Sequence, residues 1–122
     1  MNRINGKMET EIFRQAVEAL RNNAPVDAKI ETLEAEPMLP PVPMRPDCVL
    51  KITVQGREFL YFAEIKTTVT KTNRLLLLMG RERLAHPLLI VAKYVNPQVA
   101  EQLRADGMEF IDTAGNAFLN QP

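Results

Sequence analysis

The stretch that decides the fold is Cys48-Val-Leu-Lys-Ile-Thr-Val-Gln-Gly-Arg-Glu-Phe-Leu-Tyr-Phe-Ala-Glu-Ile-Lys66. It contains two runs of alternating character separated by Gln55-Gly56, and glycine readily adopts the positive φ of a tight hairpin turn. If these two residues form the loop, Val54 faces Arg57 and opposed residue numbers sum to 111. The pattern therefore predicts an antiparallel hairpin with a defined register.

The side chains on the two faces of the hairpin provide a test of this register. Side chains of a strand alternate between its faces, so each face of the hairpin is made of every second residue. One face is almost wholly apolar, because it pairs Cys48 with Ala63, Leu50 with Tyr61 and Ile52 with Phe59. The sequence predicts that this face lies against the core and that the more mixed face carries the chemistry.

The mixed face is predicted to hold two carboxylates and an amine. Continuing the register by one pair sets Asp47 opposite Glu64, with their Cβ atoms roughly 5 Å apart. Lys66 projects to the same side as Glu64, whereas Ile65 projects to the other. Two carboxylates this close repel each other in a partly buried site, so a cation between them is favoured.

Magnesium suits such a site, because it prefers carboxylate oxygens, water and substrate phosphate. Asp47 and Glu64 are the predicted metal ligands, with the main-chain carbonyl of Ile65 as a third. Lys66 could then orient or deprotonate the attacking water, or stabilise charge that develops on a phosphate oxygen. The reaction implied is hydrolysis of a phosphodiester bond, with Asp47, Glu64 and Lys66 as catalytic residues. The alternative interpretation is that Asp47 is a turn residue before a strand and that Glu64 and Lys66 lie at a solvated strand end.

Pro46-Asp47, a gap of sixteen residues and then Glu64-Ile65-Lys66 resemble the signature of the PD-(D/E)xK nuclease superfamily. The resemblance implies a restriction-endonuclease-like α/β fold, Mg²⁺ as cofactor with Mn²⁺ as a substitute, and DNA as substrate. In that superfamily an acid of the first helix often joins the metal site, and Glu9 is the best match. A first-turn glutamate favoured by the helix dipole is the alternative explanation of Glu9.

The expected order of elements agrees with this resemblance. Residues 8–22 form an amphipathic pattern, 27–35 alternate, and 37–46 are a proline-rich connector that can be neither helix nor central strand. After the hairpin the expected elements are a helix at 74–85, a strand at 88–92, a helix at 97–106, a strand at 108–112 and a short extended run at 117–119. The order is αβββαβαβ, a central mixed sheet flanked by helices.

The second half of the chain resembles a narrower family. The segment from Leu89 to Pro97, Gly107, and above all Asp112-Thr-Ala-Gly-Asn116 are similar to the nuclease-like domain of AbiEi-type transcriptional regulators, the antitoxins of type IV toxin–antitoxin systems. Members of that family usually carry a winged-helix DNA-binding segment, which has no counterpart in these residues. A turn between two strands is the alternative reading of the Gly115-Asn116 pair.

Length and composition limit the remaining possibilities. The 122 residues, of which 46% are hydrophobic, suit a single domain over residues 1–122. One cysteine and one histidine exclude an intramolecular disulfide and a Cys/His zinc cluster made by one chain. We expect Cys48 to be a core residue and His86 a loop residue. With neither a signal peptide nor an apolar run of about 20 residues, the expected location is the cytoplasm, away from membranes.

The distribution of charge along the chain bears on whether it binds nucleic acid. The formal net charge is zero, so the molecule as a whole is not drawn to nucleic acid. Residues 66–93 nevertheless hold six Lys or Arg and one acid. Within them, the candidate phosphate-binding residues are Lys71, Arg74, Arg81 and Arg83, because they follow the candidate metal site directly. A solvated helix face is the alternative role for these four side chains.

Three functions are therefore considered. The first is a Mg²⁺-dependent nuclease that cleaves DNA, and the second is a non-catalytic nuclease-fold domain of an AbiEi-type regulator or antitoxin. The third, which the sequence favours least, is a small metal-free binding module in which the motif is accidental. A homodimer, a missing winged-helix segment and a partner chain are left open by the sequence.

Overall fold

The computed structural model describes residues 7–23, 28–33, 48–54, 56–80 and 86–120. A mixed sheet of six strands forms the centre, with strand order β1-β2-β3-β4-β5-β6. Its strands are β1 (Ala28–Leu33), β2 (Cys48–Val54), β3 (Arg57–Thr68), β4 (Leu88–Tyr94), β5 (Glu109–Asp112) and β6 (Ala117–Phe118). The helices are α1 (Lys7–Asn23), α2 (Lys71–Gly80) and α3 (Pro97–Ala105). The predicted α/β class is confirmed.

The predicted hairpin register is confirmed. Cys48 pairs with Ala63, Leu50 with Tyr61 and Val54 with Arg57 in an antiparallel ladder. Gly56 has φ +80°, the left-handed conformation that the two-residue turn requires. β3 is twelve residues long, so it extends past the hairpin and carries Glu64, Ile65 and Lys66 on its second half.

β3 is also where the sheet changes direction. It is antiparallel to β2 but parallel to β4, which is in turn parallel to β5. Parallel neighbours need a crossover connection, and α2 and α3 supply the two that are required. The carboxyl ends of β3 and β4 therefore lie at the same edge of the sheet.

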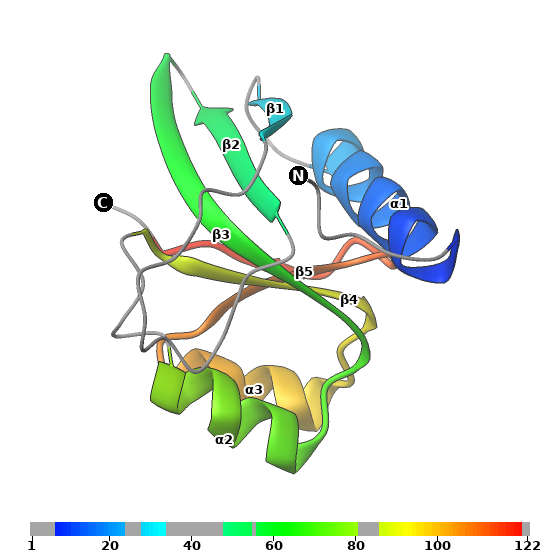
Figure 1. Cartoon of the computed structure of the whole chain (residues 1–122), viewed down its shortest axis with the longest axis vertical. Coiled ribbons are helices and arrows are strands. Elements are labelled where there is room, and N and C mark those ends of the chain that lie inside the picture. The colour runs from blue at the N-terminus through cyan, green and yellow to red at the C-terminus, as the bar shows by residue number, and fades with distance from the viewer. Residues whose placement is uncertain (1–6, 24–27, 34–47, 55, 81–85, 121–122) are drawn as a thin grey trace.

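Helices cover both faces of the sheet (Figure 1). On one face α1 contributes Ile12, Phe13, Ala16 and Leu20 to a core that also holds Leu50, Ile52, Tyr61, Ala63, Ile65, Leu89, Val91 and Ile111. On the other face α2 and α3 contribute Leu77, Ala100 and Leu103 to a core with Leu88, Ile90, Ala92 and Phe110. The alternation along β4 explains both cores: its odd-numbered residues face α1 and its even-numbered residues face α2 and α3.

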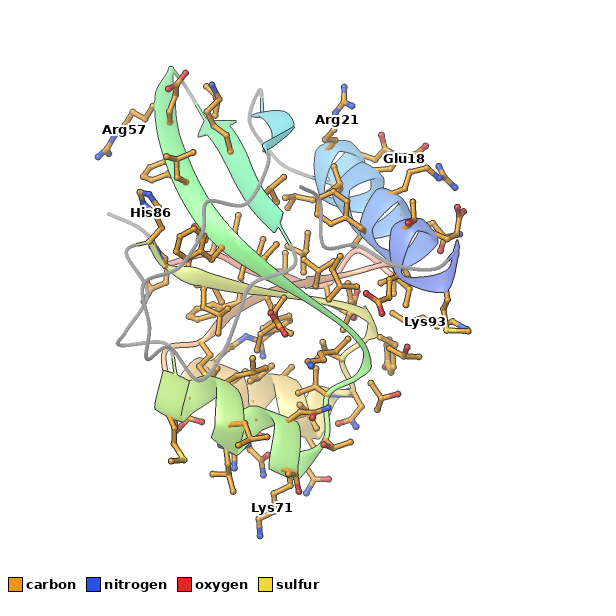
Figure 2. The ribbon with its side chains drawn as sticks, viewed as in Figure 1. Glu18, Arg21, Arg57, Lys71, His86 and Lys93 are labelled. Carbon is orange, nitrogen blue, oxygen red and sulfur yellow. The ribbon has the colours of Figure 1, made fainter. Side chains whose placement is uncertain are left out.

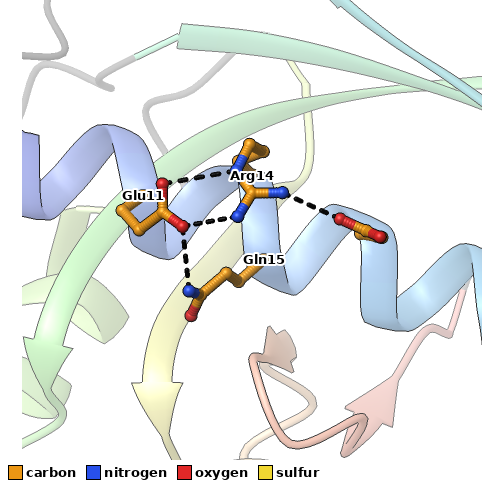
Figure 3. A network of polar contacts seen from close by, with 4 residues as sticks. Glu11, Arg14 and Gln15 are labelled. Atoms are coloured by element: carbon orange, nitrogen blue, oxygen red, sulfur yellow. Dashed lines mark hydrogen bonds and ion pairs between the residues drawn. The ribbon is translucent and has the colours of Figure 1, made fainter.

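The outer face of α1 carries a chain of charged contacts, shown in Figure 3. Arg14 donates to Glu18 at 2.9 Å and also to Glu11, which accepts a further hydrogen bond from Gln15 at 2.9 Å. The hydrogen bond from Arg14, then that from Gln15, lowers the pKa of Glu11. These pairs are exposed and lie three or four residues apart, as expected on the solvent side of a helix.

Element boundaries differ from the sequence predictions at a few points. α2 begins at Lys71 rather than at residue 74, because the Thr70 hydroxyl accepts from Asn73 N at 3.0 Å and starts the helix earlier. Residues 81–85, which the prediction assigned to the same helix, and the connector 37–46 lie outside the described residues. α3 begins after Asn96 as predicted, with the Asn96 side chain accepting from Val99 N, but it ends at Ala105 with Asp106 as its C-cap.

Two further predictions concern His86 and membrane-spanning segments. His86 lies outside the helices and strands, as expected, and its ring meets Phe62 edge to face at 5.3 Å between centroids. In the described part of the chain, no helix is long and apolar enough to cross a membrane.

Candidate active site on the central strand

Glu64 and Lys66 lie on the same face of β3, as the alternation predicted. Lys66 Nζ is 3.6 Å from Glu64 Oε1. Glu64 is 9% exposed, and its side chain projects on the α2 and α3 side, like its lateral neighbour Ile90. A buried carboxylate is costly without a charge partner, and the half-buried Lys66 ammonium supplies one. The structure therefore brings this predicted pair together in a protected setting.

Asp47, the other predicted metal ligand, lies outside the described residues. The ladder is described up to Cys48 opposite Ala63, which is one pair short of the predicted partnership of Asp47 with Glu64. Among the described residues, no group of three or more His, Cys, Asp or Glu side chains could hold a metal ion. The two-carboxylate site stays a prediction.

Ile65 occupies the strand position between the two polar residues. Its side chain is 5% exposed and belongs to the core beneath α1, so it projects to the face opposite Glu64. The residue pairs with Val91 of β4 in the parallel ladder. Its side chain anchors the strand, and the predicted role of its carbonyl as a ligand stays a prediction.

Glu9 lies in the first turn of α1 and is half-buried. That end of the helix is near the carboxyl end of β3, because the hydroxyl of Thr67 donates to Met8 Sδ at 3.6 Å. However, α1 covers the Ile65 face of the sheet, whereas Glu64 projects to the other face. The packing of α1 therefore gives no support to Glu9 as a ligand beside Glu64, and this role also stays a prediction.

The four candidate phosphate-binding residues are not alike in the structure. Lys71 is exposed at the start of α2. Arg74 is instead engaged with Asp106 of α3, its Nη1 lying 2.5 Å from Oδ2 with 15% of its side chain exposed. Arg74 therefore joins the two helices, a role that the local sequence did not reveal. Arg81 and Arg83 lie outside the described residues.

Asp112, the first residue of the Asp112–Asn116 element, has a carboxylate that is held in a network of hydrogen bonds. It is fully buried at the end of β5, and its carboxylate accepts four hydrogen bonds of 2.9–3.0 Å. The donors are the main-chain N–H groups of Val95, Ala114 and Asn116 and the side-chain amide of Asn116. This network ties the turn after β5 to the connection between β4 and α3. The Asp112–Asn116 element is thus a built turn, and Asn116 acquires the role that sequence alone did not give it.

A second buried polar contact lies on the α1 face. Tyr61 donates to Glu109 Oε1 at 2.7 Å, and the same oxygen accepts from Asn120 N at 2.7 Å. Burial, together with the hydrogen bond to Glu109, raises the pKa of Tyr61 well above its ordinary value. The neutral hydroxyl is therefore held as a donor, and the contact is structural. From the sequence, Tyr61 was expected only as an apolar partner of Leu50.

The chain matches no family model, no curated protein and no solved structure.

Proposed function

We propose that this chain is a nuclease-like domain that hydrolyses DNA phosphodiester bonds with the help of Mg²⁺. The observation that carries the proposal is the Glu64–Lys66 pair, 3.6 Å apart on one face of the central strand. It is supported by the register of β2 and β3, which one further pair would extend to Asp47 and Glu64. The element order and the change from antiparallel to parallel pairing at β3 are also what a restriction-endonuclease-like core requires.

The proposed roles follow from chemistry. Asp47 and Glu64, with the Ile65 carbonyl, would hold Mg²⁺ or Mn²⁺, whose charge would stabilise the developing negative charge of the phosphate. The Lys66 ammonium would orient the attacking water or donate to a phosphate oxygen. Because the Glu64 and Lys66 side chains are largely withdrawn from water, these interactions are stronger than on an open surface.

Cleavage of DNA tests the proposal. Plasmid and single-stranded oligonucleotide would be incubated with Mg²⁺ or EDTA and with the variants Asp47→Asn, Glu64→Gln and Lys66→Met. We expect Mg²⁺-dependent cutting by the wild type and its loss in all three variants.

The chain offers a matched control for these substitutions. Lys51 and Glu58 form an ion pair of 3.8 Å on the same face of the same sheet, away from the site. Lys51→Met and Glu58→Gln should therefore cut as the wild type does. If the site variants cut as well as these controls, any nuclease activity in the sample arises elsewhere and the proposal fails.

A second candidate is a non-catalytic domain of an AbiEi-type regulator. The observation that favours it is the Asp112–Asn116 element, which carries the resemblance to the AbiEi-type family. Its residues form a turn in which the Asp112 carboxylate accepts four hydrogen bonds, so the element has a structural role. α2 also exposes Leu75, Leu76 and Met79 on its surface, as an interaction domain can. Mg²⁺ binding without cleavage of any single- or double-stranded DNA would favour this candidate over the nuclease.

A further inference from the structure

A hollow of about 350 Å³ opens at the carboxyl ends of β3 and β4. Its walls include Thr67 and Thr68 from β3, Lys93 and Tyr94 from β4, and Val99 from α3. Ligands of α/β proteins commonly bind outside the carboxyl ends of parallel strands, and pockets of this volume accept small molecules. The hollow was not anticipated from the sequence, because it depends on the parallel pairing of two strands twenty residues apart.

The hollow adjoins the candidate active site through the ladder. Lys66 pairs with Ala92, and two residues further along Thr68 pairs with Tyr94. Since side chains two residues apart share a face, Tyr94 lies on the same face as Lys66, one strand over and about 7 Å further along.

The rim of the hollow is fixed by hydrogen bonds. On one side the side chain of Asn73 donates to the carbonyl of Thr68 at 3.3 Å. On the other, the carbonyl of Lys93 accepts from the hydroxyl of Thr113 at 2.6 Å, and Val95 N donates to the buried Asp112 carboxylate. The main chain that carries Tyr94 is thus held on both sides, and a preformed site loses little entropy on binding.

The side chains of the hollow suit a nucleotide. Tyr94 is 51% exposed, so its aromatic ring is partly open to solvent. Thr68, its partner in the ladder, is exposed on the same face and offers a hydroxyl. Lys93 is exposed on the opposite face of β4 and projects outward near the N-terminal end of α1 in Figure 2.

We propose that this hollow binds one unpaired nucleotide of a single-stranded DNA segment, with its base stacked on Tyr94. The proposal rests on the proposed nuclease function, because it places this nucleotide next to the phosphate beside Lys66. It gives that site a substrate class: DNA that is single-stranded at least on one side of the bond to be cut.

Binding measured without cleavage tests this proposal. Fluorescence anisotropy of a labelled single-stranded oligothymidine would be followed in EDTA with the full chain. Base stacking on an aromatic side chain supports roughly 5- to 150-fold tighter binding, so Tyr94→Ala should weaken binding by that factor. Tyr94→Phe keeps the ring and should bind as the wild type does.

Met79→Ala is the matched control, because Met79 is an exposed apolar residue of α2 that does not line the hollow. Unchanged binding by Tyr94→Ala, an equal loss in Tyr94→Phe, or no binding of the single strand by the wild type would overturn the proposal. So would a blunt duplex that binds as tightly and depends equally on Tyr94. Loss of binding in Tyr94→Ala without any Mg²⁺-dependent cutting by the wild type would sink the nuclease function and leave the nucleotide site standing.

Discussion

At the scale of single residues, two buried carboxylates on the same face of the sheet are stabilised in different ways. Asp112 is surrounded by four N–H donors, whereas Glu64 has a lysine two residues away as its charged partner. The first arrangement holds a turn together and presents no reactive group. The second places an acid and an amine side by side on the central strand, which is why Glu64 and not Asp112 belongs to the candidate site.

Asp112→Asn should therefore destabilise the protein without a change of shape. An amide would turn an NH₂ group toward N–H donors such as Val95 N, so we expect a loss of about 3 kcal/mol in the free energy of unfolding. Urea unfolding followed by circular dichroism measures this loss. Glu101→Gln, an exposed change on α3, should alter stability by less than about 0.5 kcal/mol. A change in Asp112→Asn no larger than in this control would contradict the structural role.

The Tyr61–Glu109 contact predicts a dependence on alkaline pH. Removing the hydroxyl in Tyr61→Phe should cost about 1–2 kcal/mol at pH 7, because a buried carboxylate loses a donor. The unfolded chain releases the phenolic proton near the ordinary pKa of about 10, whereas the raised pKa of Tyr61 keeps it bound in the folded state. The unfolded state then binds fewer protons, so this part of the wild-type stability is present below pH 10 and falls above it.

The difference between wild type and Tyr61→Phe should accordingly shrink from pH 9 to pH 11, by at most about 1.4 kcal/mol per pH unit above 10. Denaturant unfolding at each pH measures it, and Tyr94 cancels because both proteins contain it. A difference that stays constant to pH 11 would mean that Tyr61 is not held as a neutral donor.

At the scale of elements, two glycines with positive φ differ in the space that a side chain would have. Gly56 and Gly115 have φ +80° and +96°, but a Cβ at Gly56 would meet nothing within 4 Å, whereas one at Gly115 would lie 2.9 Å from Asn23 Nδ2. The turn after β5 thus lies against the last residue of α1. This contact links a local turn to the packing of a helix far away in the sequence.

Gly115→Ala should cost more stability than Gly56→Ala. Both pay the strain of a left-handed alanine, about 1 kcal/mol, and Gly115→Ala adds the displacement of Asn23 for a total of about 2–3 kcal/mol. Urea unfolding of the two variants provides the comparison. Asn23→Ala in the Gly115→Ala background should recover part of the loss, and equal costs at the two glycines with no recovery would contradict the contact.

At the scale of the whole molecule, metal binding should be linked to folding. A cation that binds only the folded state raises stability by RT ln(1 + [L]/Kd), about 2.7 kcal/mol at 100 times Kd. Millimolar Mg²⁺ or Mn²⁺ should therefore raise the Tm of the wild type, and Asp47→Asn or Glu64→Gln should reduce the shift. Lys66→Met should retain or enlarge it, because the variant removes a positive charge beside the proposed site.

Thermal melting with and without the ion measures this linkage, and Glu58→Gln should keep the wild-type shift because Glu58 pairs with Lys51 elsewhere on the sheet. A folded wild type whose Tm does not respond to either ion would count against the metal site in both proposed functions.

Features that depend on neighbours along the chain could be predicted from the residues alone. The hairpin register followed from the Gln55-Gly56 turn and the alternation on either side, and the start of α3 followed from Asn96-Pro97. Both were confirmed because turn and cap geometry involve only a few consecutive residues. The same local rule placed Glu64 and Lys66 on one face of β3.

The contacts between distant segments could not be predicted in this way and became visible only in the folded chain. The parallel pairing of β3 with β4 sets Thr68 beside Tyr94 and creates the hollow, the packing of α2 on α3 joins Arg74 to Asp106, and α1 covers the face opposite Glu64. No pattern in consecutive residues encodes these contacts, because they arise from the burial of apolar faces between elements that are far apart in the chain. The sequence thus identified the acid and the amine, and the fold decided what surrounds them.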